Sequence, residues 1–244
     1  MYHELVGDFC MRLDKFLSNM GKASRSESGR LARSGKITVN GAIVKKPDIH
    51  IDENKDIICV NSVTVNYKKY AYIMLNKPEG YVSATDDDRE KTVLDLLPDE
   101  ERRLNLFPCG RLDKNTLGLV ILTNDGDSAH KCLSPKHHVD KIYKFECKLP
   151  LTLENIKALE EGVDIGGYFT KPCKISMYDE ASGEITLTEG KYHQIKRMLE
   201  AVDNKITYLE RITFGGIKLD SSLERGEWRY LTSDEEALFI NGGK

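Results

Sequence analysis

The stretch Phe107-Pro-Cys-Gly-Arg-Leu-Asp-Lys-Asn-Thr-Leu-Gly-Leu-Val-Ile-Leu-Thr-Asn-Asp-Gly126 joins a polar loop to the most apolar segment of the chain. Leu117 to Leu122 is predicted to be a buried strand, and Asn124-Asp125-Gly126 gives a turn signal directly after it. Asp113 would then lie at the mouth of a core strand, beside the fixed cation of Arg111. Such a carboxylate stays ionised, which suits a nucleophile better than a general acid.

The tetrapeptide Arg-Leu-Asp-Lys occurs twice, at residues 12–15 and at residues 111–114. The first copy has the apolar spacing of an amphipathic helix, so Asp14 is expected to be a solvated charge on a helix face. The second copy has no helical period and leads into a strand. On this stretch alone, a capping or ion-paired structural carboxylate remains an open interpretation of Asp113.

Composition narrows the class of protein. The chain has 244 residues, of which 40% are hydrophobic, enough for one large domain or two smaller ones. There is no run of eighteen apolar residues and no basic, apolar start, so neither a membrane span nor a secretory signal is expected. The six cysteines are scattered without metal-ligand spacing, which favours reduced thiols in a cytoplasmic protein and no metal site.

The formal net charge of −3 hides a strong local imbalance. Residues 11–50 carry nine Lys/Arg against three Asp/Glu, a balance of +6 that leaves −9 for the remainder. Phosphate binding depends on local cation density, so this basic segment is a candidate clamp for RNA or DNA. A solvated basic face is the alternative that charge alone leaves open.

Local signals predict a compact unit in the basic segment. Ser24-Arg-Ser-Glu27 has the pattern of a capping box that opens a helix to about Ser34. Asn40-Gly41, between two short β-rich runs, is a strong hairpin signal. Ile57 to Val65 is expected to be a strand that completes the unit, and the helix from Ser24 would present its arginines outward.

The N-terminal segment resembles the S4 RNA-binding domain. The resemblance rests on Arg12-Leu-Asp-Lys-Phe-Leu17, Ser24-Arg-Ser-Glu27, Gly35-Lys-Ile-Thr-Val-Asn-Gly41 and Val44-Lys-Lys-Pro-Asp48. It implies an αα-hairpin domain over residues 11–65 that binds structured RNA, preceded by an extension of residues 1–10. The residues expected to contact RNA are Arg12, Lys15, Arg25, Arg30, Arg33 and Lys36.

A polar linker at residues 66–69 is expected to lead into a second domain at residues 70–244. In this domain Lys141 to Leu149 alternates as a half-buried strand, and Tyr143 on it would be a core tyrosine if the strand is considered alone. Glu189 to Val202 has helical spacing. Its apolar stripe would be buried, while another face and the helix start would suit a phosphate-rich partner.

The second domain resembles the pseudouridine synthases, and within them the RsuA family, which acts on small-subunit ribosomal RNA. The resemblance rests on four motifs, Asn76-Lys-Pro-Glu-Gly80, Gly110 to Gly126, Lys141-Ile-Tyr143 and Glu189-Gly-Lys-Tyr-His-Gln-Ile-Lys-Arg-Met198. The implied fold class is α+β, with a mixed, largely antiparallel sheet and a central cleft. The implied activity is isomerisation of a uridine in 16S ribosomal RNA to pseudouridine, without cofactor or metal.

The resemblance also implies roles for residues. Asp113 would be the catalytic aspartate, Tyr143 would stack on the target base, Lys196 would keep Asp113 ionised, and Arg111 would occupy the gap left by the extruded nucleotide. Lys191, His193 and Arg197 would contact RNA.

The expected partner is 16S ribosomal RNA or a pre-30S particle, and the expected state is a cytoplasmic monomer away from membranes. Two alternatives remain open: a large-subunit (23S) pseudouridine synthase, and a non-catalytic assembly factor that uses only its S4 domain. Large-subunit relatives usually have Asn-Arg-Gln where this chain has Tyr192-His193-Gln194, and His137-His138 ahead of Tyr143 also favours the small-subunit branch.

Overall fold

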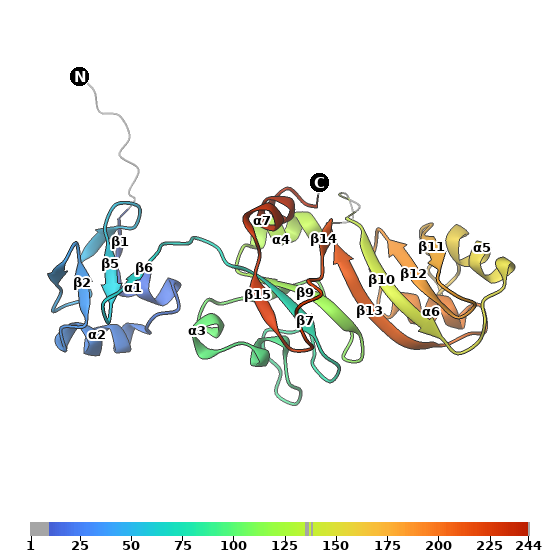
Figure 1. Cartoon of the computed structure of the whole chain (residues 1–244), viewed down its shortest axis with the longest axis horizontal. Coiled ribbons are helices and arrows are strands. Elements are labelled where there is room, and N and C mark those ends of the chain that lie inside the picture. Colours follow the sequence, from blue (N-terminus) through green and yellow to red (C-terminus); the bar gives the residue numbers. More distant parts are fainter. Residues whose placement is uncertain (1–9, 135–136, 138, 244) are drawn as a thin grey trace, which may run out of the picture. The chain divides into compact units, whose positions relative to one another are not determined.

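A computed structural model describes residues 10–134, 137 and 139–243 (Figure 1). Residues 1–9 of the expected extension at residues 1–10, and also His138, lie outside the described residues, whereas Cys10 belongs to a strand. The chain divides into two compact units. One runs to Ala71 and includes Leu97–Leu106, and the other comprises Tyr72–Leu96 and the chain from Phe107 onward.

The N-terminal unit contains two short helices, a two-stranded sheet and a four-stranded sheet. The helices are α1 (Leu13–Asn19) and α2 (Arg25–Arg33). The two-stranded sheet pairs β1 (Cys10–Arg12) with β4 (His50–Asp52). The larger sheet has the order β3-β2-β5-β6, with β2 (Ile37–Val39), β3 (Ala42–Ile43), β5 (Ile58–Val60) and β6 (Val63–Val65).

Two local predictions for this unit are confirmed. The Ser24 hydroxyl accepts the Glu27 amide N–H at 3.3 Å, and the Glu27 carboxylate accepts the Ser24 amide N–H at 2.7 Å, which is the capping box at the start of α2. Between β2 and β3 the backbone turns through Asn40 and Gly41, whose φ values are 51° and 81°. These residue types tolerate the left-handed region that a tight hairpin turn requires.

Two other predictions were wrong. Asp14 is 6% exposed, because its carboxylate is paired with Arg12, whose Nη2 donates to it at 2.7 Å. Asp14 is therefore a paired, buried carboxylate. The expected strand from Ile57 to Val65 is split into β5 and β6, because Asn61 and Ser62 take positive φ values and turn the chain into a hairpin.

Residues far along the chain complete the N-terminal unit. The segment Leu97–Leu106 contains α3 (Asp99–Arg102). Lys22 forms an ion pair with Glu100, and Arg103 Nη2 lies 3.4 Å from Glu27 Oε1. These pairs lie at the surface and orient the segment Leu97–Leu106 within the unit. As exposed ion pairs they contribute little to the stability of the fold.

The second unit is built on a nine-stranded sheet with the central order β11-β12-β10-β13-β9-β7-β15, in which β8 also pairs with β9 and β14 with β13. The pairing of β9 with β13 is parallel, and the other described pairs are antiparallel. The predicted mixed, largely antiparallel sheet is confirmed. The strands are β7 (Tyr72–Lys77), β8 (Phe107–Cys109), β9 (Leu117–Thr123), β10 (Lys141–Cys147), β11 (Lys174–Met177), β12 (Ser182–Leu187), β13 (Ile206–Phe214), β14 (Ile217–Lys218) and β15 (Trp228–Tyr230).

Helices pack on this sheet. At one end α4 (Gly126–Leu133) contacts α7 (Ser233–Ile240), and toward the other α5 (Leu153–Glu161) contacts β11 and α6 (Gln194–Glu200) contacts β13 (Figure 1). A short 3₁₀ helix spans Val93–Leu96. The predicted apolar stripe of α6 is buried, with Met198 and Leu199 packed in one core with Phe145 and Leu209. In the described parts of both units, no helix is long and apolar enough to cross a bilayer.

Close backbone contact holds β9 against β13. Gly118 pairs with Arg211 and has a φ of 96°, and a Cβ atom there would lie 2.3 Å from the Arg211 carbonyl oxygen. Any side chain at this position would force the parallel strands apart. Because the catalytic candidate Asp113 lies just ahead of β9, this contact also positions the loop.

We expect Gly118→Ala to lower the free energy of unfolding by about 2–4 kcal/mol, because backbone strain and steric overlap act together. Gly126→Ala is the matched control, since no atom lies within 4 Å of its Cβ position and its φ is ordinary. Denaturant titration of both variants measures the difference. Equal stability of the two variants would contradict the close-packing account.

Candidate active site

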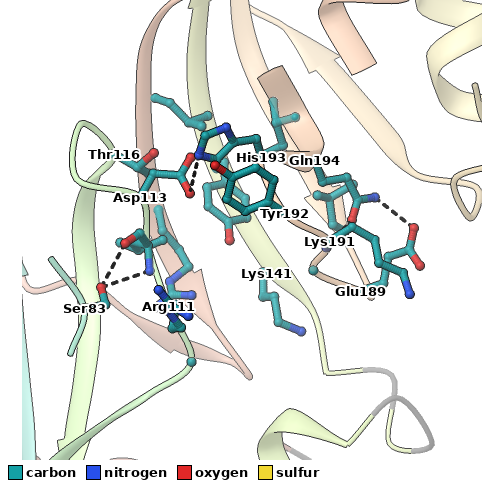
Figure 2. Close-up of a pocket in the computed structure, with 18 of the residues that line it drawn as sticks. Ser83, Arg111, Asp113, Thr116, Lys141, Glu189, Lys191, Tyr192, His193 and Gln194 are labelled. Carbon is teal, nitrogen blue, oxygen red and sulfur yellow. Dashed lines mark hydrogen bonds and ion pairs between the residues drawn. The ribbon is translucent and has the colours of Figure 1, made fainter. Parts of the chain in front are cut away.

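A cavity of about 640 Å³ opens in the second unit. Its walls come from the loop that carries Gly110 to Thr116, from β10 and β13, and from the segment Glu189 to Lys196. Asp113 lies on one side, and Tyr192, His193 and Gln194 face it from the other (Figure 2). Cavities of this size accommodate small ligands or a single residue of a polymer.

The loop that carries Asp113 is anchored by backbone contacts on both sides. The Ser83 hydroxyl donates to the Leu112 carbonyl and accepts the Leu112 N–H, each at 3.0 Å. Beneath the loop, Lys77 is fully buried, and its ammonium donates to the carbonyls of Pro78, Lys114 and Thr116 at 3.1, 3.1 and 2.8 Å. Burial lowers the pKa of Lys77 to about 8, although the nearby carboxylate of Asp113 opposes this.

Lys196, on the first turn of α6, reaches the Asp113 carboxylate. Its Nζ lies 2.7 Å from Asp113 Oδ2 and also donates to Asn115 Oδ1 at 2.6 Å. The side chains of Asp113 and Lys196 are 26% and 19% exposed, and both residues line the cavity. The arrangement holds a charged oxygen beside an empty volume, which is the geometry that nucleophilic or proton-transfer chemistry requires.

A stacked pair of rings faces the carboxylate. His193 Nε2 lies 3.6 Å from Asp113 Oδ1, too far for a hydrogen bond, and the His193 backbone has a φ of 51°. The Tyr192 ring stacks on the imidazole with centroids 3.8 Å apart, and Tyr192 is 77% exposed. An uncommon backbone conformation thus places an exposed aromatic surface next to Asp113.

A buried carboxylate fixes the segment that leads into α6. Glu189 accepts hydrogen bonds from the Tyr168 hydroxyl at 2.6 Å, the Lys171 amide at 3.0 Å and Gln194 Nε2 at 2.9 Å. Burial opposes ionisation here, but these donors lower the pKa of Glu189 below its usual range. The charge of Glu189 is therefore used for structure, and it holds Gln194, whose Oε1 accepts the Lys191 N–H at 2.9 Å.

The structure brings the four predicted catalytic residues together at one cavity. Asp113, Tyr143, Lys196 and Arg111 all line the cavity, as do Lys191 and His193. Arg197 is not among its lining residues. The residues of the N-terminal unit that were predicted to bind RNA are all exposed: Arg12, Lys15, Arg25, Arg30, Arg33 and Lys36.

The sequence interpretation missed several basic residues at this site, among them Lys77, Lys141 and Arg211. Lys77 had a usable signal, a lysine at the end of a strand that is otherwise apolar. Arg211 and Lys141 line the cavity, but which face of a strand they occupy depends on pairing register. Spacing within one strand could not reveal that register.

Comparison with known proteins identifies the class. The family model described as RNA pseudouridylate synthase matches residues 71–201, and the S4 domain model matches residues 11–57. The chain belongs to the RNA pseudouridylate synthases and carries an S4 domain. The family resemblance inferred from the motifs is thereby confirmed.

Several known proteins are similar over nearly the whole chain. An uncharacterised RNA pseudouridine synthase of Bacillus subtilis is 46% identical over 92% of this chain and 96% of its own length. Ribosomal small subunit pseudouridine synthase A of Escherichia coli is 38% identical over 94% of this chain and 100% of its own length. A crystal structure of a pseudouridylate synthase is 35% identical, with a TM-score of 0.65 over 94% of this chain and 99% of that one.

We expect Lys77→Met to destabilise the protein by about 2–4 kcal/mol and to reduce isomerisation, because three carbonyls, of which that of Thr116 is buried, lose their donor. Lys77 has a folded-state pKa of about 8, below its value in the unfolded chain, so the unfolded state binds more protons above pH 8. The stability of the wild type relative to Lys77→Met should therefore rise between pH 8 and 10, by up to about 1.4 kcal/mol per unit.

Denaturant titrations at several pH values provide the measurement. Lys157→Met, on the exposed face of α5, is the control and should give a difference that does not depend on pH. A flat difference for Lys77→Met across this range would show that Lys77 keeps its ordinary titration in the folded protein.

Proposed function

We propose that this protein isomerises one uridine of 16S ribosomal RNA to pseudouridine during maturation of the small subunit. The observation that carries the proposal is the Asp113 carboxylate, held 2.7 Å from Lys196 at a cavity that Tyr143 also lines. The RNA class is supported by relatives named ribosomal small subunit pseudouridine synthase A, at 37–38% identity. Tyr192-His193-Gln194 in place of Asn-Arg-Gln favours the same substrate over 23S ribosomal RNA.

The reaction explains why these residue types are needed. The bond from N1 to C1′ breaks, the base turns, and C5 bonds to C1′, while the C5 proton leaves and N1 gains a proton. The change is redox-neutral, and it needs a carboxylate close to both sugar and base. Asp113 supplies this group, and Lys196 balances its charge in the ground state.

A uracil inside a folded RNA must leave its stack before it reaches Asp113. Extrusion costs a few kcal/mol, which stacking on an aromatic ring and contacts to the backbone offset. Tyr143 supplies the ring and Arg111 enters the space that the nucleotide leaves. Lys191 and His193 contact the RNA beside the cavity, where Lys191 Nζ lies 4.2 Å from the centre of the Tyr168 ring.

The proposed substrate is a folded 16S fragment or a pre-30S particle, bound by a monomer in the cytoplasm. The N-terminal unit presents exposed basic residues on α2, and the catalytic pocket recognises one nucleotide. An RNA long enough to contact both units gains the second contact intramolecularly. A short stem-loop offers the catalytic unit few phosphates and should be a poor substrate.

Asp113→Asn should reduce tritium release from 16S RNA labelled at C5 of uridine to below a few per cent of wild type, because the amide is not an ionised carboxylate. RNA affinity should stay within a few fold, since the cationic surfaces are unchanged. Asp14→Asn, in the same tetrapeptide of the N-terminal unit, should leave kcat at saturating RNA unaltered. Substantial turnover by Asp113→Asn would remove Asp113 from the mechanism, and release from 23S RNA alone would favour the large-subunit alternative.

Replacement of Arg25, Arg30 and Arg33 by Ala should weaken binding of a long 16S fragment. The slope of log affinity against log salt should flatten by about one unit for each phosphate that the variant no longer neutralises. The helix itself should persist, because the Ser24–Glu27 capping box is intact. Circular dichroism checks this, and kcat on a short stem-loop is the internal control. Unchanged affinity and salt slope would show that this basic face does not bind RNA.

A further inference from the structure

Arg211 carries a buried charge without an ionic partner among the described residues. The residue is 2% exposed and lines the active-site cavity from β13. Its Nε donates to the Leu119 carbonyl at 2.8 Å, whereas Nη2 has no hydrogen-bond partner within the described chain. Burial of a cation without a counter-ion is costly in free energy. An anionic ligand that bound beside the cation would offset this cost.

A break in strand pairing places Arg211 beside Tyr143. Along β10 and β13, Ile142 pairs with Thr213 and Tyr143 pairs with Arg211, so Ile212 is left over as a bulge. Cross-strand partners project from the same face of a sheet, and a bulge changes which residues do so. Arg211 therefore projects from the same face of the sheet as the ring proposed to stack on the target base, and its guanidinium lies 5.0 Å from the centre of the Phe214 ring.

Lys141 adds a second cation at the same wall. Its Nζ donates to the Val139 carbonyl at 2.7 Å. Burial lowers the pKa of Lys141, and the charge of Arg211 lowers it further, while Asp140 opposes the shift. The two cations repel each other, and an anion between them would relieve that repulsion.

The carboxylates of the cavity do not supply that anion. Among the described residues that line it, seven are Lys or Arg and two are Asp or Glu. Asp113 is paired with Lys196, and Glu189 is held by Tyr168, Gln194 and a backbone amide. The negative charge that Arg211 and Lys141 lack must therefore come from the ligand.

We propose that Arg211, together with Lys141, forms a subsite for the phosphate group of the nucleotide whose base stacks on Tyr143. This inference rests on the proposed function and adds a contact to it. A uracil carbonyl is the other oxygen acceptor that could reach this wall, but it carries no net charge. Charge-assisted pairing of arginine with phosphate is the stronger match for an unneutralised guanidinium.

The test compares binding of uridine 5′-monophosphate, uridine and inorganic phosphate to the full-length protein, by calorimetry or by NMR titration at millimolar ligand. We expect the wild type to bind the monophosphate about tenfold or more tightly than uridine, as for hydrogen bonds to charged groups. Arg211→Met should abolish this preference and leave uridine affinity unchanged. Arg211→Lys should retain part of it.

Arg225→Met is the matched control. Arg225 forms an ion pair with Glu210 at 2.8 Å in the same unit and does not line the active-site cavity. It should lose thermal stability and keep the preference for the monophosphate. Arg211→Met removes the donor to the Leu119 carbonyl and the contact with the Phe214 ring, so its thermal stability is measured beside that of Arg225→Met and ligand preference is compared on folded protein of both variants.

Three results would overturn the subsite. They are no preference for the monophosphate over uridine in the wild type, a preference that is unchanged in Arg211→Met, and an equal loss of affinity for the monophosphate and for uridine in Arg211→Met. The last result would assign the contact to the base. Tritium release from 16S RNA, measured in parallel, separates this inference from the activity. Preference without release rejects the isomerase alone, and release without preference rejects the phosphate site alone.

Discussion

The ion pair between Lys196 and Asp113 links two segments of the second unit that lie far apart in the sequence. Asp113 belongs to the loop ahead of β9, whereas Lys196 belongs to the helix between β12 and β13. This ion pair forms only if the loop that carries Asp113 and the start of the helix that carries Lys196 are both held in place. Lys77 and Ser83 fix the loop from below, and the hydrogen bonds of Glu189 fix the entry to the helix. The site is therefore held by buried polar contacts that support a half-buried ion pair.

Charge is distributed unevenly between the cavity wall and the rest of the chain. Outside residues 11–50 the chain carries a net −9, yet the cavity wall is strongly cationic. Two of these cations are paired with carboxylates, Lys196 with Asp113 and Lys114 with Glu90. Arg211 is buried, and its guanidinium has no ionic partner among the described residues. Such a cation is suited to an anionic ligand that arrives and leaves.

Sequence patterns were sufficient where structure depends on near neighbours. The buried strand β9, the capping box at Ser24 and the apolar stripe of α6 all follow from spacing within a dozen residues. The motifs were long enough to indicate the family and to place Asp113 and Lys196 together. These features depend on period, capping and turn chemistry, which a single sequence records directly.

Features that helix or strand spacing does not record were not accessible. Asp14 was expected in solvent, but Arg12, two residues ahead of it, pairs with its carboxylate, and such side-chain pairing leaves no period in the sequence. Arg211 faces the cavity because a bulge shifts the register between β10 and β13, and no pattern in either strand marks that shift. Leu97–Leu106 joins the N-terminal unit although Tyr72–Leu96, which belongs to the other unit, separates it from Ala71 in the chain. Such packing is decided by tertiary contacts.

The central claim is that the carboxylate of Asp113 converts a uridine of the small-subunit RNA. The most direct measurement maps pseudouridine by chemical sequencing in the 16S and 23S ribosomal RNA of cells whose chromosomal copy carries Asp113→Asn. The account predicts that one pseudouridine disappears from 16S RNA, that the 23S pattern is unchanged, and that a wild-type copy restores the lost site. An unaltered 16S pattern, or a loss confined to 23S RNA, would contradict it.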